Sequence, residues 1–166
     1  MKLLLLDKDN TLIRPTSGEF VDAPWHQEPL PNVAETLHRK LREGWRSVII
    51  SNQAGIEAGH KSLEQTFLEF RYCLGLLPEI DEAYFCPSFD GAEAWQVWGD
   101  CKDQHRILCR DGEIWGGFRK PSPGMLRVAI ATHCPSEVLY VGDRPEDQQA
   151  AQAAQVPFQW AKDFFV

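Results

Sequence analysis

Four short polar clusters in this 166-residue sequence hold the side chains that could do chemistry. They are Asp7-Lys8-Asp9-Asn10-Thr11, Ser51-Asn52-Gln53, Arg119-Lys120 and Gly142-Asp143-Arg144-Pro145-Glu146-Asp147. Aspartates gathered in a cleft of low dielectric would repel one another strongly unless a cation neutralised them, and ligands that are all oxygens suit Mg²⁺. Lys120 and the Ser51 hydroxyl could hold an anion on the other side, most simply a phosphoryl group. The residue types therefore point to phosphoryl chemistry at a magnesium site.

Two carboxylates at a short spacing suit a two-step hydrolysis. One aspartate can attack phosphorus to give an aspartyl-phosphate, which splits a very slow reaction into two easier steps. A second carboxylate, placed two residues later by a turn, could protonate the leaving oxygen and later activate water. Asp7 and Asp9 have this spacing.

The elements between the clusters predict how the clusters meet. Leu3–Leu6 and residues 47–50 are short apolar runs, typical of parallel strands covered on both faces. Further strands are expected at residues 82–86, 137–141 and 156–160, and helices after Asn32, Ser62, Ser122 and Arg144. This alternation predicts an α/β fold, a doubly wound parallel sheet of about five strands in one domain spanning residues 1–166. Ligands of such sheets bind beyond the carboxyl ends of the strands, where the polar clusters would converge.

Some details of these elements can be predicted further. Asn32 and Ser122 are the expected N-caps of two helices, and Pro157 places the last strand at a sheet edge. Residues 87–118 break the alternation and are expected to be an insertion, with a hairpin as one option. The three tryptophans in it, Trp95, Trp98 and Trp115, could stack on a substrate ring, although packing against the core is commoner.

The four motifs, in this order and over nearly the whole chain, resemble the haloacid dehalogenase superfamily of phosphatases. The resemblance implies that Asp7 is the nucleophile and Asp9 the acid and base. It implies magnesium ligation by Asp7, the backbone carbonyl of Asp9 and Asp143, with Asp147 supporting the metal from behind. The residues expected at the phosphate or substrate are Thr11, Ser51, Asn52, Arg119 and Lys120.

The stretches Ser51–Ile56 and Arg119–Met125 are similar to subfamily IIIA, in the branch containing heptose bisphosphate and histidinol-phosphate phosphatases. That branch usually has glycine where Asn10 stands, but asparagine tolerates the same left-handed backbone. Many of its members also carry a zinc loop of cysteines and a histidine. Here Ser88 stands in place of the histidine and Gly117-Phe118 in place of the second cysteine pair. Zinc is therefore not expected.

A zinc site of other composition is the remaining alternative for the insertion and its flank. Its four candidate ligands are Cys86, Cys101, His105 and Cys109. Their spacing matches no zinc signature, so free thiols and an ordinary histidine are the favoured interpretation.

The amino-acid composition limits which binding partners and cellular environment are expected. With 17 basic and 24 acidic residues the net charge is -7, which repels polyanions and makes nucleic acid an unfavoured partner. No apolar run approaches the ~18 residues of a membrane span. Five scattered cysteines make a disulfide framework improbable, and a reducing cytoplasm is expected. The sequence does not indicate an oligomeric state.

The expected function is Mg²⁺-dependent hydrolysis of a small phosphorylated metabolite, such as a sugar or amino-alcohol phosphate, through an aspartyl-phosphate. Only 39 residues separate Thr11 from Ser51, too few for a separate cap domain, so the site should be open. An open site also admits bulky substrates, so a polynucleotide 3'-phosphatase is the main alternative. A receiver domain of signalling proteins is the alternative from another class. Its phosphoaccepting aspartate follows the third strand, whereas Asp7 follows the first.

Overall fold

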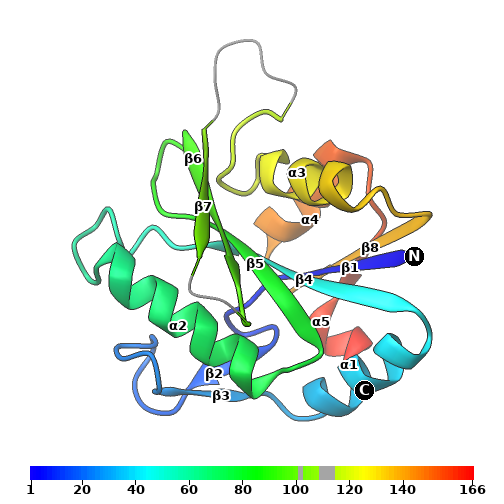
Figure 1. Cartoon of the computed structure of the whole chain (residues 1–166), viewed down its shortest axis with the longest axis horizontal. Helices are drawn as coiled ribbons and strands as arrows, with labels where there is room; N and C mark the ends of the chain where they lie inside the picture. The colour runs from blue at the N-terminus through cyan, green and yellow to red at the C-terminus, as the bar shows by residue number, and fades with distance from the viewer. Residues whose placement is uncertain (101–102, 109–114) are drawn as a thin grey trace.

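The described residues of this computed structural model (1–100, 103–108 and 115–166) form a mixed sheet of seven strands with helices on both faces (Figure 1). The strands of this sheet are β1 (Lys2–Leu6), β4 (Trp45–Asn52), β5 (Ile80–Cys86), β6 (Glu93–Trp98), β7 (Gln104–Leu108), β8 (Glu137–Gly142) and β9 (Phe158–Trp160). Their order across the sheet is β7-β6-β5-β4-β1-β8-β9. Five neighbouring strands run parallel to one another: β5, β4, β1, β8 and β9. The expected α/β fold and the edge position of the last strand are confirmed.

The helices complete the layers around the sheet. They are α1 (Val33–Arg42), α2 (Leu63–Leu76), α3 (Gly124–His133), α4 (Pro145–Ala154) and α5 (Ala161–Phe164). A small hairpin of β2 (Ile13–Pro15) and β3 (Gln27–Pro29) lies between β1 and α1, and there is no cap domain in the described part of the chain. None of these helices is long and apolar enough to span a membrane.

Strand β1 shows how the core is divided. Leu4 and Leu6 belong to the apolar cluster that α1, α2 and α5 cover, whereas Leu3 and Leu5 belong to the cluster under α3 and α4. Successive strand residues point to opposite faces, so a strand covered on both faces must be apolar throughout. All four leucines are fully buried. This double burial fixes the strand that leads into Asp7.

The insertion extends the sheet. Strands β6 and β7 form an antiparallel hairpin, and β6 pairs with β5, which accounts for two strands beyond the five expected. Trp95 of β6 packs edge-on against Phe67 of α2 with ring centroids 5.2 Å apart, and Trp115 packs against the opposite cluster. The packing interpretation holds for these two tryptophans.

One expected helix cap is confirmed in position only, and the other is wrong. Asn32 is the N-cap of α1, but it has a left-handed conformation (φ 64°) and makes no side-chain capping bond, and its amide donates to the Phe165 carbonyl at 3.3 Å instead. A tertiary contact with the C-terminal segment thus replaces the local cap. Ser122 lies in a turn with its N–H bonded to the Arg119 carbonyl at 2.8 Å, so Pro123 takes the cap position.

Candidate active site

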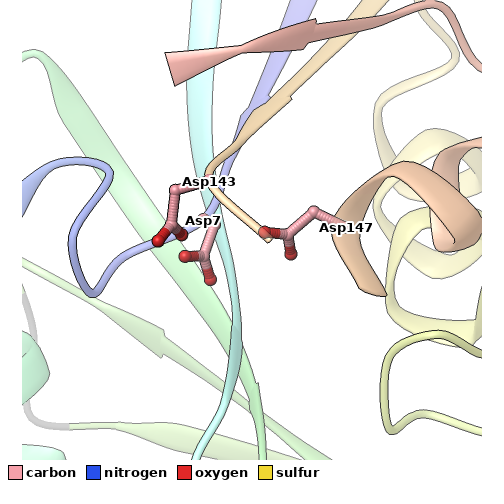
Figure 2. Close-up of side chains that lie close together, drawn as sticks. All are labelled: Asp7, Asp143 and Asp147. Carbon is pink, nitrogen blue, oxygen red and sulfur yellow. The ribbon is translucent and has the colours of Figure 1, made fainter. Parts of the chain in front are cut away.

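Asp7 meets Asp143 and Asp147, which come from near the other end of the sequence, at the carboxyl edge of the sheet (Figure 2). Asp7 follows β1, Asp143 follows β8, and Asp147 lies in the first turn of α4. Because β1 pairs with β8 in parallel, Leu6 lies beside Val141 and the two strands end together. One carboxylate oxygen from each aspartate lies within 4.8 Å of the others. The expected convergence of these residues is present in the geometry.

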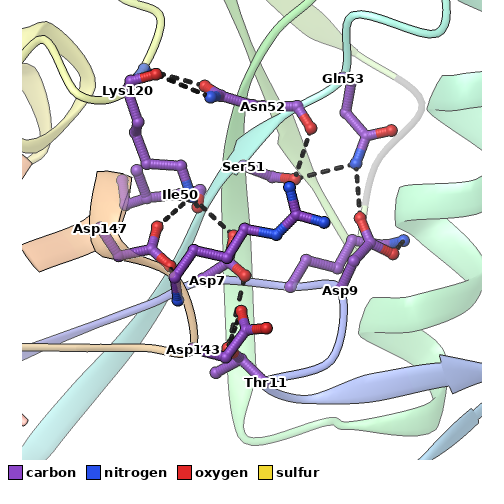
Figure 3. A network of polar contacts seen from close by, with 12 residues as sticks. Asp7, Asp9, Thr11, Ile50, Ser51, Asn52, Gln53, Lys120, Asp143 and Asp147 are labelled. Atoms are coloured by element: carbon purple, nitrogen blue, oxygen red, sulfur yellow. Dashed lines mark hydrogen bonds and ion pairs between the residues drawn. The ribbon is translucent and has the colours of Figure 1, made fainter. Parts of the chain in front are cut away.

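Lys120 places its ammonium group inside this cluster (Figure 3). Nζ donates to Asp7 Oδ1 at 2.6 Å and to Asp147 Oδ1 at 2.7 Å, and it also reaches the Ile50 carbonyl at 3.0 Å. Burial alone favours the neutral amine, but Asp7 and Asp147 outweigh burial and raise the pKa of Lys120. One buried cation therefore faces three carboxylates.

Asp147 is held from three directions, which suits a supporting role. Tyr140 donates its hydroxyl to Asp147 Oδ1 at 2.7 Å, and the backbone N–H of Arg144 donates to Oδ2 at 3.1 Å. Gly142 makes room for this arrangement, because a Cβ there would lie 2.5 Å from Asp147 Oδ2. Lys120 Nζ donates to the same oxygen, Oδ1, as the Tyr140 hydroxyl, so the fixed carboxylate of Asp147 orients the lysine.

The cluster fits a magnesium ion. Burial raises the pKa of Asp7 to about 7; Lys120 opposes the shift, and the charge of Asp147 adds to it. A divalent cation would offset this excess of negative charge, and the available donors are carboxylate oxygens, which Mg²⁺ prefers. Thr11 Oγ1 lies 3.4 Å from Asp7 Oδ2 and 3.2 Å from Asp143 Oδ1, within hydrogen-bonding reach of both. The donor set and the charge thus both suit the expected metal.

Asp9 points away from the three clustered carboxylates. Its Oδ1 accepts from Lys8 Nζ at 3.0 Å and its Oδ2 from Gln53 Nε2 at 2.9 Å. Burial would raise its pKa, but Lys8, Lys61 and the Gln53 hydrogen bond together lower it. Asn10, the next residue, has φ 61°, the left-handed conformation expected where relatives carry glycine. The resting Asp9 is a carboxylate beside the cluster.

Ser51 and Asn52, at the end of β4, lie at the same edge. Ser51 is buried, and its hydroxyl accepts from Gln53 Nε2 at 2.9 Å. Asn52 Nδ2 donates to the Lys120 carbonyl at 3.0 Å, and its Oδ1 accepts from the Lys120 N–H at 2.9 Å. Both ends of the Asn52 amide are therefore engaged with the backbone of Lys120. Its observed contacts position the lysine rather than leave the amide free for a phosphoryl group.

Arg119 offers an unused donor. Its guanidinium lies over the Phe89 ring at 5.3 Å, and its Nη1 is buried with no hydrogen-bond partner among the described residues. A buried unpaired donor is costly unless a ligand completes it. The expected contact of this arginine with an anionic substrate stays a prediction.

Four further residues of the network had no role assigned from the sequence: Lys8 and Gln53, which lie in the polar clusters, and Glu69 and Tyr140, which lie outside them. Two of them carried a readable signal. Lys8 is fully buried between two aspartates, and Glu69 occupies the buried face of α2 with Phe67, Phe70 and Cys73. A charged residue on an apolar helix face requires a buried partner of opposite charge. Applied to α2, this rule predicts a buried basic partner for Glu69.

The zinc question is only partly addressed by the described residues. Cys86 is buried at the end of β5 with its thiol 3.5 Å from the Ser88 carbonyl, and burial raises its pKa. His105 is exposed in β7. Cys101 and Cys109 lie outside the described residues. The absence of zinc therefore stays a prediction.

We expect the purified protein to contain no stoichiometric zinc, because serine and glycine replace the usual ligands at residues 88 and 117. Elemental analysis after dialysis measures this directly. One zinc per chain, lost together with the fold when Cys86 is replaced by serine, would contradict the prediction. The exposed Cys134 replaced by serine is the matched control.

Comparison with known proteins agrees with this site. The family model described as polynucleotide kinase 3 phosphatase matches residues 2–165. A D-glycero-beta-D-manno-heptose-1,7-bisphosphate 7-phosphatase of Rhodopseudomonas palustris is 29% identical over 135 residues, 77% of this chain and 66% of that protein. A probable D-glycero-D-manno-heptose-1,7-bisphosphate 7-phosphatase of Thermoplasma volcanium is 27% identical over 95% of this chain and 97% of that protein.

A solved structure shares the fold and bears on the metal. D,D-heptose 1,7-bisphosphate phosphatase from B. bronchiseptica, complexed with magnesium and phosphate, superposes with a TM-score of 0.67 at 25% identity, over 96% of this chain and 79% of that chain. A homologue thus binds Mg²⁺, and the buried aspartates described above can hold the same ion. With residues 2–165 matched, the chain belongs to the polynucleotide kinase 3 phosphatase family, within the haloacid dehalogenase superfamily of phosphatases.

Proposed function

We propose that this chain hydrolyses the phosphate monoester of a small sugar phosphate, with a sugar bisphosphate as the favoured substrate class. The observation that carries the proposal is the buried cluster at the end of β1, where Asp7 lies against Lys120 and beside two further aspartates. Relatives named as heptose bisphosphate phosphatases support the substrate class.

Asp7 and Asp9 divide the chemistry between them. An Asp7 carboxylate oxygen forms a bond to phosphorus while the bond to the leaving oxygen breaks, and that oxygen takes a proton from Asp9. In the second step Asp9 takes a proton from water, whose oxygen attacks the aspartyl-phosphate and releases inorganic phosphate. Mg²⁺ held by Asp7, the Asp9 carbonyl and Asp143 would neutralise the charge of the phosphoryl group.

The surrounding residues keep this geometry. Lys120 and Ser51 would face the anionic part of the substrate, and Asn52 fixes the backbone of Lys120. Asp9 rests as a carboxylate, which suits the second step. A phosphate ester entering beside it adds negative charge and displaces water, and both effects raise its pKa toward the protonated form that the first step needs.

A polynucleotide 3'-phosphatase is the second candidate, because the matching family model carries that description and the described residues include no cap domain. Charge opposes it. Residues 87–118 hold three basic side chains and six acidic ones: Lys102, Arg106 and Arg110 against Asp90, Glu93, Asp100, Asp103, Asp111 and Glu113. Arg106 is already paired with Glu93. Residues 87–118 would therefore offer a polyanion few cations to neutralise its phosphates.

We expect a small sugar bisphosphate to be turned over about tenfold better in kcat/KM than a 3'-phosphorylated oligonucleotide, since a polyanion must find phosphate contacts along its length. Steady-state kinetics on both substrates at several salt concentrations measures the difference. An oligonucleotide that is the better substrate, with a steep loss of activity as salt rises, would favour the second candidate instead.

A further inference from the structure

A closed ring of five polar side chains connects Asp9 to helix α2. Asp9 Oδ1 accepts from Lys8 Nζ at 3.0 Å, and the same ammonium donates to Glu69 Oε1 at 2.6 Å. Asp9 Oδ2 accepts from Gln53 Nε2 at 2.9 Å, part of the network in Figure 3. Gln53 Oε1 accepts from Lys61, which also donates to Glu69 Oε2 at 2.9 Å. Glu69 thus fixes one partner of Asp9, Lys8, directly through Oε1 and the other partner, Gln53, through Oε2 and Lys61.

The ring is most deeply buried at Lys8 and Glu69, whereas Lys61 is 18% exposed and Asp9 is the most exposed member. The side chain of Lys8 is 0% exposed and that of Glu69 4%, whereas that of Asp9 is 44% exposed. Two ammonium groups and two carboxylates balance in charge. Burying charged groups is costly even when they are paired, and well-packed apolar side chains often serve stability as well or better. A purely structural need would not require this arrangement.

Glu69 is itself held rigidly. Its backbone carbonyl accepts from Gln27 Nε2 at 2.9 Å, and its neighbour Phe70 stacks on Phe85 with centroids 4.9 Å apart. The Lys8 ammonium lies over the Phe70 ring at 5.3 Å. Side chains built on a packed helix hold a partner more accurately than side chains on a loop. The ring therefore transmits the position of α2 to Asp9.

We propose that Glu69 is a positioning residue for Asp9, which it orients through Lys8 on one side and through Lys61 and Gln53 on the other. The inference rests on the proposed function, in which Asp9 transfers a proton. A carboxylate oxygen can accept two hydrogen bonds, and each oxygen of Asp9 accepts one in the ring, so each keeps one site free for the proton. Proton transfer requires the carboxylate within hydrogen-bonding reach of the leaving oxygen. Two anchored oxygens restrict its rotation to that orientation.

The test compares two esters that differ in their need for an acid. Nitrophenolate leaves p-nitrophenyl phosphate without a proton, whereas the alkoxide of glycerol phosphate must be protonated. In Glu69→Gln, with Mg²⁺ present, kcat/KM for glycerol phosphate should fall about tenfold more than kcat/KM for p-nitrophenyl phosphate, a fraction of what a positioned acid supplies. Equal losses for the two esters, or no loss for either, would overturn the proposal.

A matched control separates positioning from general damage. Glu82 is a second buried glutamate, which accepts from Gln96 at 2.7 Å and pairs with His133 outside the ring. Glu82→Gln should leave the ratio of the two esters unchanged, and a selective loss there would count against the proposal. If Glu69→Gln does not fold, Lys61→Met takes its place. Its side chain is 18% exposed, and it should show a smaller selective loss. If Lys61→Met lowers kcat/KM for both esters by the same factor, the inference is overturned.

The variant Asp9→Asn distinguishes this inference from the function on which it rests. If Asp9→Asn itself shows no selective loss of glycerol phosphate hydrolysis, the proposed acid role is wrong. If Asp9→Asn shows the selective loss while the ring variants do not, the acid role stands and Glu69 has no positioning role.

Discussion

Asp7→Asn will lower phosphate release about 10⁴-fold, because an amide is neither a competent nucleophile nor an anionic metal ligand. Both functions are concentrated in this side chain, which is buried against Lys120 and within 4.8 Å of the Asp143 and Asp147 carboxylates. Initial rates with a sugar bisphosphate at saturating Mg²⁺ measure the loss.

The control for Asp7→Asn is the same chemical change at Asp81, whose exposed carboxylate lies 3.6 Å from Arg46. Asp81→Asn should retain the activity of the unaltered protein. The thermal unfolding temperature of both variants shows whether the fold is intact. Activity of Asp7→Asn within tenfold of the unaltered protein would exclude Asp7 as the nucleophile.

Lys120→Met will lower the free energy of unfolding by about 3–5 kcal/mol, since removing one member of a buried ion pair leaves charges without compensation. Asp7 and Asp147 both lose a partner that lies within 2.7 Å. Phosphate release should fall as well, because the anion loses its cation. Urea unfolding with and without Mg²⁺ measures the stability. Mg²⁺ should stabilise the variant more than the unaltered protein, because a bound cation replaces part of the missing charge.

The control for Lys120→Met is Lys40→Met, which removes a lysine paired with the exposed Glu43 at 2.8 Å. Exposed pairs of this kind contribute little, so the unfolding curve should hardly move. If Lys120→Met is as stable as Lys40→Met in the absence of Mg²⁺, the buried ion pairs do not hold the cluster together.

Local patterns predicted the fold well where the cause was local. The continuous leucines of β1 identify a strand covered on both faces, and Ser62 with Gln65 forms a capping box that begins α2. Asn32 has the same local signature, but its amide contacts the carbonyl of Phe165, 133 residues away. A helix cap can be predicted from four consecutive residues, whereas a tertiary contact with a distant residue cannot.

The candidate site shows the same division. Asp7 and Asp143 were predictable because parallel strands end at one edge, and the structure brings them together. Glu69 lies in a helix that contributes none of the recognised motifs, and its bond to Lys8 spans 61 positions. Nothing in the linear spacing of motifs predicts such a contact. A hairpin was one option for the insertion, but its pairing with β5 was not predictable, since a hairpin pattern does not indicate which sheet it joins.

The central position of β1 has a consequence during synthesis. This strand is made before β4 and β8, yet it lies between them, and Leu6 pairs with both Ile49 and Val141. Until β8 has been translated, one edge of an apolar strand stays open, and open edges of that kind recruit other chains. A product that ends before residue 137 also lacks Asp143. Chains that end before β8 should therefore be both inactive and prone to aggregate, because the same strand covers the open edge of β1 and leads to Asp143.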